Sequence, residues 1–126
     1  MADQPGNGAH LLIVEDNGDL RDVLAMVLSM KGYSVRCAKN GSQALAMMQA
    51  AGGRPSLLIT DLQMPGFDGW ALRRGMLADE DLATVPVVVM SAAIPRDNKD
   101  ALAASAYLEK PVSLKSLLDS IEAHIE

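Results

Sequence analysis

Short apolar runs alternate with segments of helical periodicity along this chain. The run Val87-Val88-Val89-Met90 has no polar alternation, which is typical of a strand that is buried on both faces. Other runs have lengths typical of β-strands. Five strands are therefore predicted, at residues 10–14, 34–38, 57–60, 86–90 and 106–108.

The segment after the first run has the spacing of an amphipathic helix. Its apolar residues follow the i, i+3, i+4, i+7 pattern of a single helical face, and Gly32 is placed to end the helix. These apolar residues are Leu20, Val23, Leu24, Val27 and Leu28.

Four further helices are predicted between and after the remaining runs. The second covers residues 41–51, and the third runs from about Trp70 to Glu80. The fourth begins at Pro95, because proline fits the first helical position, where its missing N–H is not needed. The last repeats the amphipathic spacing from Leu114 to Ile125, with Ser113 as its predicted N-cap.

Alternating strands and helices predict an α/β fold, in which a doubly wound parallel sheet has helices on both faces. The 126 residues are enough for one domain with its own core. We expect residues 10–126 to form this domain. Residues 1–9 read as a polar, flexible N-terminal arm.

The composition of the chain limits its expected cellular location and its expected binding partners. Eleven basic and sixteen acidic residues give a net charge of -5, which works against direct nucleic-acid binding. No apolar stretch approaches the roughly 18 residues of a membrane span, and the start of the chain has no signal-peptide pattern. Cys37 is the only cysteine, so an intrachain disulfide is excluded and a cytoplasmic location is expected.

Polar and charged residues follow four of the predicted strands. Glu15-Asp16 follow the first, Asp61 the third, Ser91 the fourth and Lys110 the fifth. Ligands of open parallel sheets bind beyond the carboxyl ends of the strands. We therefore expect these residues to share one site.

Three carboxylates in one site repel each other unless a proton or a cation joins them. Oxygen ligands with open positions suit Mg²⁺, and Mn²⁺ would satisfy the same ligands. Asp61 could also act as a nucleophile toward a phosphoryl group and form an aspartyl phosphate. Lys110 and the metal would then stabilise the transferred charge, while Ser91 could donate a hydrogen bond.

Four motifs together resemble the receiver domain of two-component response regulators, over about residues 10 to 125. They are Glu15-Asp16, the stretch from Asp61 to Gly69, Ser91-Ala92, and the stretch from Tyr107 to Pro111. The resemblance implies a flavodoxin-like fold with five parallel strands in the order 2-1-3-4-5 and five helices.

The resemblance also implies a set of metal ligands. Asp61 would be the phosphoacceptor and Asp16 a direct Mg²⁺ ligand. Glu15 would help to hold the ion through water, and Gln63 would offer its backbone carbonyl.

Other residues of the motifs would stabilise and report the phosphorylated state. Lys110 would pair with Asp61 and with the phosphoryl group, and the Lys110–Pro111 peptide bond would be cis. Ser91 would be the switch hydroxyl and Tyr107 the switch aromatic.

The function implied is that of a phosphorylation-dependent signalling switch, not of an enzyme beyond assisting its own phosphorylation and dephosphorylation. A sensor histidine kinase or a histidine phosphotransfer protein would supply the phosphoryl group. The fourth helix, fifth strand and fifth helix would then present the state to a protein target that the sequence does not identify. The chain would be a monomer or a phosphorylation-dependent dimer.

Two other classes of protein remain as alternatives. A Mg²⁺-dependent phosphatase or phosphotransferase could use Asp61 as its nucleophile, but it would need an acid two residues later, where this chain has Gln63. A nucleotide- or flavin-binding module would need a Gly- or Ser/Thr-rich loop after the first strand. That position holds Glu-Asp-Asn-Gly-Asp, which would repel phosphate.

Overall fold

The computed structural model describes residues 10–62, 68–92 and 103–125. All five predicted strands are present in these residues, and helices follow the first three strands and the last one. In chain order they are β1 His10–Val14, α1 Gly18–Met30, β2 Ser34–Ala38, α2 Gly41–Gln49, β3 Leu57–Thr60, α3 Gly69–Leu77, α4 Glu80–Ala83, β4 Val87–Ser91, β5 Ala106–Glu109 and α6 Leu114–His124.

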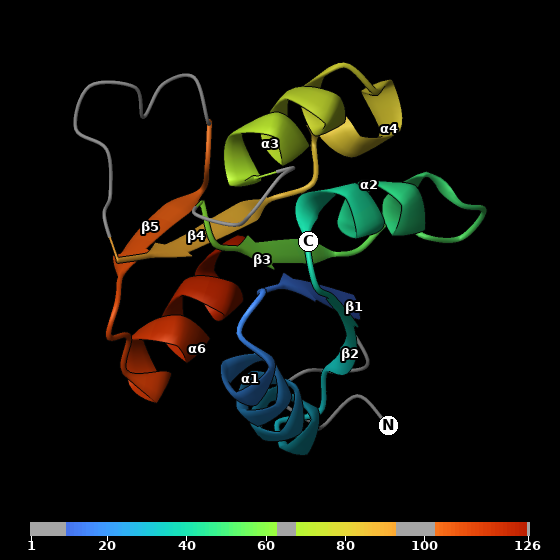
Figure 1. The fold of residues 1–126 in the computed structure, drawn as a ribbon. Helices are drawn as coiled ribbons and strands as arrows, with labels where there is room; N and C mark the ends of the chain where they lie inside the picture. Colours follow the sequence, from blue (N-terminus) through green and yellow to red (C-terminus); the bar gives the residue numbers. More distant parts are fainter. Residues whose placement is uncertain (1–9, 63–67, 93–102, 126) are drawn as a thin grey trace.

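One parallel sheet forms the middle layer of the molecule (Figure 1). Its strand order is β2-β1-β3-β4-β5, and every neighbouring pair is parallel. Helices α1 and α6 cover one face, and α2, α3 and α4 cover the other (Figure 1). The predicted doubly wound fold and its 2-1-3-4-5 order are thus confirmed.

Each face of the sheet carries its own hydrophobic core, because successive side chains of a strand point to opposite faces. In β1, Leu12 and Val14 pack toward α2 and α3, whereas Leu11 and Ile13 pack toward α1 and α6. All four are at most 1% exposed. Burial on both faces explains why the sequence of the central strands shows no polar alternation.

Side-chain caps set the starts of the helices. The side chain of Asn17 accepts a hydrogen bond from the Leu20 N–H at 3.1 Å and so begins α1. Ser113 caps α6 as predicted, accepting from the Ser116 N–H. At the other end of α1, Gly32 has a φ of 95°, a left-handed conformation that glycine adopts without steric cost.

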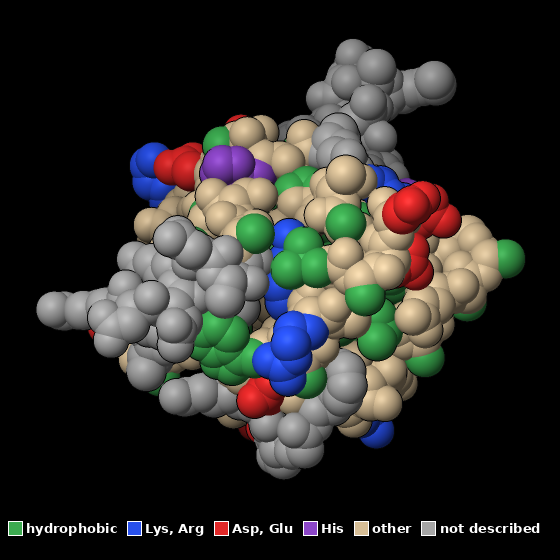
Figure 2. Space-filling model, turned by 90° about the horizontal axis from the view of Figure 1, so that it is seen from above, with side chains coloured by type: hydrophobic (Ala, Val, Ile, Leu, Met, Phe, Trp, Pro, Cys, Tyr) green, Lys and Arg blue, Asp and Glu red, His purple; other side chains and the backbone are tan. Residues whose placement is uncertain are grey.

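The predicted third helix is wrong in its extent, because it is two helices. Helix α3 ends at Leu77, and Asp79 caps the short α4 by accepting a hydrogen bond from the Asp81 N–H at 2.9 Å. The acidic side chains gathered over α4 (Figure 2) therefore begin a helix instead of ending one. Acidic residues are favoured in a first helical turn by the helix dipole.

Two other predicted boundaries bear on the fold. The second helix ends at Gln49, two residues before the predicted 51. The predicted fourth helix, beginning at Pro95, lies outside the described residues. None of the described helices has the length and apolar character needed to cross a membrane.

Candidate functional site

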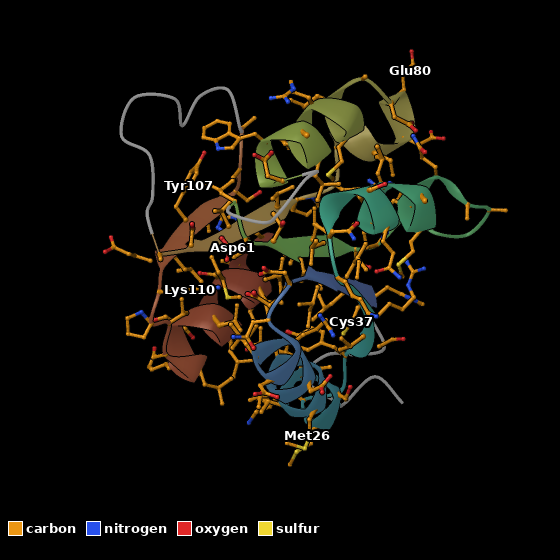
Figure 3. The ribbon with its side chains drawn as sticks, viewed as in Figure 1. Met26, Cys37, Asp61, Glu80, Tyr107 and Lys110 are labelled. Atoms are coloured by element: carbon orange, nitrogen blue, oxygen red, sulfur yellow. The ribbon has the colours of Figure 1, made fainter. Side chains whose placement is uncertain are left out.

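The carboxyl ends of four strands meet at one edge of the sheet. Glu15 follows β1, Asp61 follows β3, Ser91 ends β4, and Lys110 follows β5. Figure 3 shows Asp61 and Lys110 together at this edge. The predicted juxtaposition of acids and a lysine is therefore observed.

Three carboxylates form a compact cluster there. Each of Glu15, Asp16 and Asp61 offers an oxygen, and these atoms all lie within 4.8 Å of one another. Glu15 is 1% exposed and Asp61 is 6% exposed, whereas Asp16 is exposed to solvent. Like charges at this separation, two of them away from water, repel strongly unless cations balance them.

Lys110 supplies one of those cations. Its Nζ donates hydrogen bonds to Glu15 Oε1 and to Asp61 Oδ2, each at 2.8 Å. Burial alone would lower the pKa of Lys110, but the hydrogen bonds and charges of Asp61 and Glu15 together outweigh it and raise that pKa above its usual value. The ammonium therefore stays charged at neutral pH. Sequence reasoning anticipated its pairing with Asp61 but missed its pairing with Glu15.

Glu15 is held from three sides. Besides the bond to Lys110, its Oε2 accepts a hydrogen bond from the Asn17 N–H at 3.1 Å. Arg21, in α1, donates from Nη1 to the Glu15 backbone carbonyl at 2.8 Å. Both carboxylate oxygens of Glu15 are thus engaged by the protein, which leaves Asp16 as the acid most open to a solvated cation. Sequence reasoning missed Arg21, whose only sequence signal was its place in the helix that follows Glu15.

Helix α3 approaches the backbone of Asp61 very closely. A Cβ at Gly69 would lie 2.4 Å from the Asp61 carbonyl oxygen and 2.8 Å from the Leu62 Cα, so only glycine fits there. Asp68 caps α3 by accepting a hydrogen bond from the Ala71 N–H at 3.0 Å. The start of α3 thereby braces the strand end that carries Asp61.

Ser91 and Tyr107 lie on the same face of the sheet. Val89 pairs with Tyr107 and Ser91 with Glu109, and residues two apart in a strand share a face. Ser91 is fully buried, and Tyr107 is half-buried against the core under α3, on the α3 side in Figure 3. The backbone also links the two strand ends, since the Lys110 N–H donates to the Ser91 carbonyl at 2.8 Å.

Two expectations from the resemblance remain, one for the Lys110–Pro111 peptide bond and one for Gln63. The Lys110–Pro111 peptide bond is cis, as the resemblance implied. Gln63, the expected carbonyl ligand, lies outside the described residues.

The residues at this edge fit a hard divalent cation. Three carboxylates and one ammonium leave two formal negative charges, which is the charge that a divalent ion balances. All the donors are oxygens, the ligand type that Mg²⁺ prefers. Glu15, Asp16 and Asp61 are thus the residues that could hold it.

An apolar groove adjoins the site on the α1 side of the sheet. It has a volume of about 560 Å³ and runs between α1 and α6, with Lys110 at its wall. Val23, Met26 and Met30 of α1 are 51%, 59% and 80% exposed, so apolar surface continues outward from the groove along α1.

Comparisons with known proteins agree with this arrangement. The family model of the response regulator receiver domain matches residues 11–122. The phosphate regulon transcriptional regulatory protein PhoB of Pseudomonas aeruginosa is 32% identical over 119 residues, which are 92% of this chain and 51% of that protein. The chain spans about half the length of the curated relatives it matches.

Solved structures show the same fold. The chemotaxis protein CheY4 of Vibrio cholerae aligns with a TM-score of 0.85 and 25% identity, over 94% of this chain and 99% of that one. The receiver domain of the sensor histidine kinase PA1611 from Pseudomonas aeruginosa aligns with a TM-score of 0.81 and 25% identity, over 93% and 97% of the two chains. That structure has a magnesium ion coordinated in its active site cleft. With the family model matching most of its length and an acidic cluster that fits a Mg²⁺-dependent phosphorylation site, this chain belongs to the response regulator receiver domain family of two-component systems.

Proposed function

We propose that Asp61 accepts a phosphoryl group and that the chain is the switch of a two-component pathway. The observation that carries this proposal is Lys110, whose ammonium bridges Glu15 and Asp61 at 2.8 Å each beside the exposed Asp16. A carboxylate oxygen of Asp61 attacks phosphorus, the bond from phosphorus to the donor atom breaks, and the donor leaves with that electron pair. Lys110 then stabilises the negative charge on the phosphoryl oxygens.

Mg²⁺ is the proposed cofactor. Asp16 and Asp61 would bind it directly, Glu15 would hold it through water, and Gln63 would offer its carbonyl. Bound there, the ion would neutralise charge on the phosphoryl oxygens. The magnesium ion in the PA1611 receiver domain supports this choice, and Mn²⁺ would satisfy the same oxygen donors.

Ser91 and Tyr107 are the proposed switch residues. The Ser91 hydroxyl moves toward the phosphoryl oxygens and leaves space on its own face of the sheet. Tyr107, which shares that face, turns into this space. A local change of charge thereby biases a two-state element, and the face formed by the predicted helix from Pro95, β5 and α6 reports it to a protein target.

A histidine kinase or histidine phosphotransfer protein is the proposed phosphoryl donor. Its phosphohistidine must reach Asp61, so the surface beside it must lie against this edge of the molecule. The groove between α1 and α6 adjoins Lys110 and offers the donor an apolar docking surface.

We also propose the boundaries of the domain, its location and its oligomeric state. Residues 10–126 constitute the receiver domain and residues 1–9 an arm outside it. The protein acts in the cytoplasm as a monomer or a phosphorylation-dependent dimer, without direct nucleic-acid contact. A phosphatase with Asp61 as nucleophile is disfavoured, because Gln63 occupies the position of its general acid.

Intact mass after incubation with acetyl phosphate and Mg²⁺ tests the proposal. The native protein should gain one phosphoryl group, and Asp61→Asn or removal of the metal should abolish the gain. Asp68→Asn is the matched control: it removes a nearby acid while keeping a capping side chain, and it should be modified like the native protein. An equal adduct on Asp61→Asn would refute the assignment.

A further inference from the structure

Asp16 is the acid of the site that is exposed to solvent, and its carboxylate is not held by other side chains. Among the described residues, none makes a hydrogen bond or ion pair with that carboxylate. Its position is therefore set by the backbone on either side of Asp16. A metal ligand that is held in place before the ion arrives costs less to order on binding.

The peptide groups on both sides of Asp16 are held by hydrogen bonds. The one before it carries the Glu15 carbonyl, which accepts a hydrogen bond from Arg21 Nη1 at 2.8 Å. The one after it carries the Asn17 N–H, which donates to Glu15 Oε2 at 3.1 Å. Rotation of either peptide group would redirect the Cα–Cβ bond of Asp16, so the two hydrogen bonds together fix the direction of its side chain.

Glu15 is itself fixed, so it cannot follow a turn of these peptide groups. Its N–H donates to the Ala38 carbonyl of β2 at 3.1 Å, and its Oε1 accepts from Lys110 Nζ at 2.8 Å. Every polar group of Glu15 therefore has a partner in the protein. The bond from Arg21 is the one that a substitution outside the acidic site can remove.

The Arg21 side chain reaches back along the first turn of α1 to make its bond. Gly18 is the first residue of α1, and a Cβ built on it would lie 3.4 Å from Arg21 Nη2. The guanidinium thus lies over the start of the helix and contacts a residue of the carboxylate cluster. Its positive charge at that place would repel a divalent cation, so any effect of Arg21 in favour of the cation must come from the geometry it imposes.

We propose that Arg21 is a positioning residue for the proposed metal ligand Asp16: its guanidinium fixes the peptide group between Glu15 and Asp16 and so holds Asp16 in place to bind Mg²⁺. This inference rests on the proposed function, in which Asp16 binds the ion directly. Groups that orient metal ligands typically contribute roughly tenfold or more to metal affinity. Loss of the Arg21 bond should therefore weaken Mg²⁺ binding, although it also removes a repelling charge.

Backbone NMR tests this inference without a measurement of activity. A Mg²⁺ titration followed by amide shifts gives the dissociation constant, and relaxation of the metal-free protein gives the order parameter of the Asp16 amide. Arg21→Met removes the donor and the charge but keeps an apolar stem. Lys31→Met is the matched control, because it removes an exposed cation at the other end of α1.

In Arg21→Met, the Mg²⁺ dissociation constant should rise about tenfold, and the order parameter of the Asp16 amide should fall below its native value. Arg21→Lys keeps the charge and a donor on a shorter side chain, so it should lie between Arg21→Met and the native protein. Lys31→Met should match the native protein in both measurements. If thermal unfolding shows that Arg21→Met does not fold, Arg21→Lys carries both measurements.

Tighter Mg²⁺ binding by Arg21→Met would overturn the inference, because the charge of Arg21 would then outweigh any positioning. A native dissociation constant would overturn it too, even with a lower melting temperature, because Arg21 would then act only on stability. Both results leave the proposed function intact. Failure of the native protein to bind Mg²⁺ would instead refute the proposed function, and the order parameter of the metal-free Asp16 amide would still decide whether Arg21 fixes this peptide group.

Discussion

Lys110 is the residue on which the electrostatics of the site depend. Its two hydrogen bonds, to carboxylates 95 and 49 residues away in sequence, join β5 to β1 and β3. Glu15 and Asp61 are largely removed from water, so their repulsion is weakly screened. Any cation that enters the site shares these carboxylates with Lys110.

We expect Lys110→Met to destabilise the metal-free protein by about 1–3 kcal/mol, because it removes the ammonium that donates a hydrogen bond to each of two buried carboxylates. Mg²⁺ should then raise the stability of this variant more than that of the native protein. Urea unfolding with and without Mg²⁺ measures both effects. Lys115→Met is the control, because Lys115 and Asp119 form an exposed pair, and its stability should not change measurably.

The difference in stability between the native protein and Lys110→Met should depend on pH in a defined way. A lysine whose folded-state pKa is raised, as for Lys110, contributes stability below its unfolded pKa and loses it as pH rises through the folded value. The difference between native protein and Lys110→Met should therefore be constant through neutral pH and shrink only in strongly alkaline solution. A difference that disappeared between neutral and mildly alkaline pH would contradict the ion-pair geometry.

At the scale of elements, helix starts position the site. Asn17 begins α1 directly after Glu15 and Asp16, and Asp68 begins α3 beside Asp61. Each cap fixes where its helix starts, and the strand end next to it is held accordingly. The close approach of α3 to Asp61 depends in addition on the missing side chain at Gly69.

Gly69→Ala should destabilise the protein by about 1–3 kcal/mol, because its Cβ would overlap backbone atoms that cannot move without displacing β3 or α3. Urea unfolding gives this value, and phosphorylation of Asp61 should slow in parallel. Gly18→Ala is the control: its Cβ would meet only the end of the Arg21 side chain, at 3.4 Å, and alanine favours helix. Equal destabilisation of both variants would argue against the contact with Asp61.

The apolar side chains exposed on α1 should form part of the docking surface for the phosphoryl donor. Val23 lines the groove beside Lys110 and is 51% exposed. Val23→Gln should slow phosphotransfer from a phosphohistidine protein about tenfold, as expected for loss of an apolar docking contact. Its reaction with acetyl phosphate should be unchanged, because a small donor needs no docking surface.

Leu77→Gln provides the control for that experiment. Leu77 is 43% exposed but lies on α3, on the other face of the sheet. Transfer rates from the phosphohistidine protein should be native for this variant. A loss in Leu77→Gln equal to that in Val23→Gln would place the donor elsewhere.

At the scale of the whole molecule, the two cores together explain the stability of the sheet. Each core contains two side chains of β1. β1 contributes to both cores and pairs with β2 and β3. Its position in the middle of the sheet makes it indispensable to the fold.

Removal of residues 1–9, the proposed N-terminal arm, should leave both the melting temperature and the phosphorylation of Asp61 close to their native values. Thermal unfolding and intact mass check this expectation. A longer deletion, through Val14, should abolish folding, because it removes four side chains that are at most 1% exposed. A large loss of stability on removing residues 1–9 alone would show that the domain begins earlier than proposed.

Much of the fold was predictable because strand and helix patterns are local. In the run Leu57–Thr60 the first three residues are apolar, and the run is a fully buried strand at the predicted position. The third helix was predicted too long because apolar spacing does not detect a competing cap. The Asp79 side chain begins a new helix within two residues of the end of α3.

By itself, the sequence determined the fold class and the residues of the acidic edge, because parallel strands bring their carboxyl ends to one side of a sheet. Only the tertiary structure decided the second bond of Lys110, to Glu15, and the fit of Gly69 against Asp61. It also decided the burial of Arg73, which is 6% exposed and which the pattern of α3 does not indicate. Each of these depends on distances of a few ångströms between segments far apart in the chain, and no local pattern of residues encodes such distances.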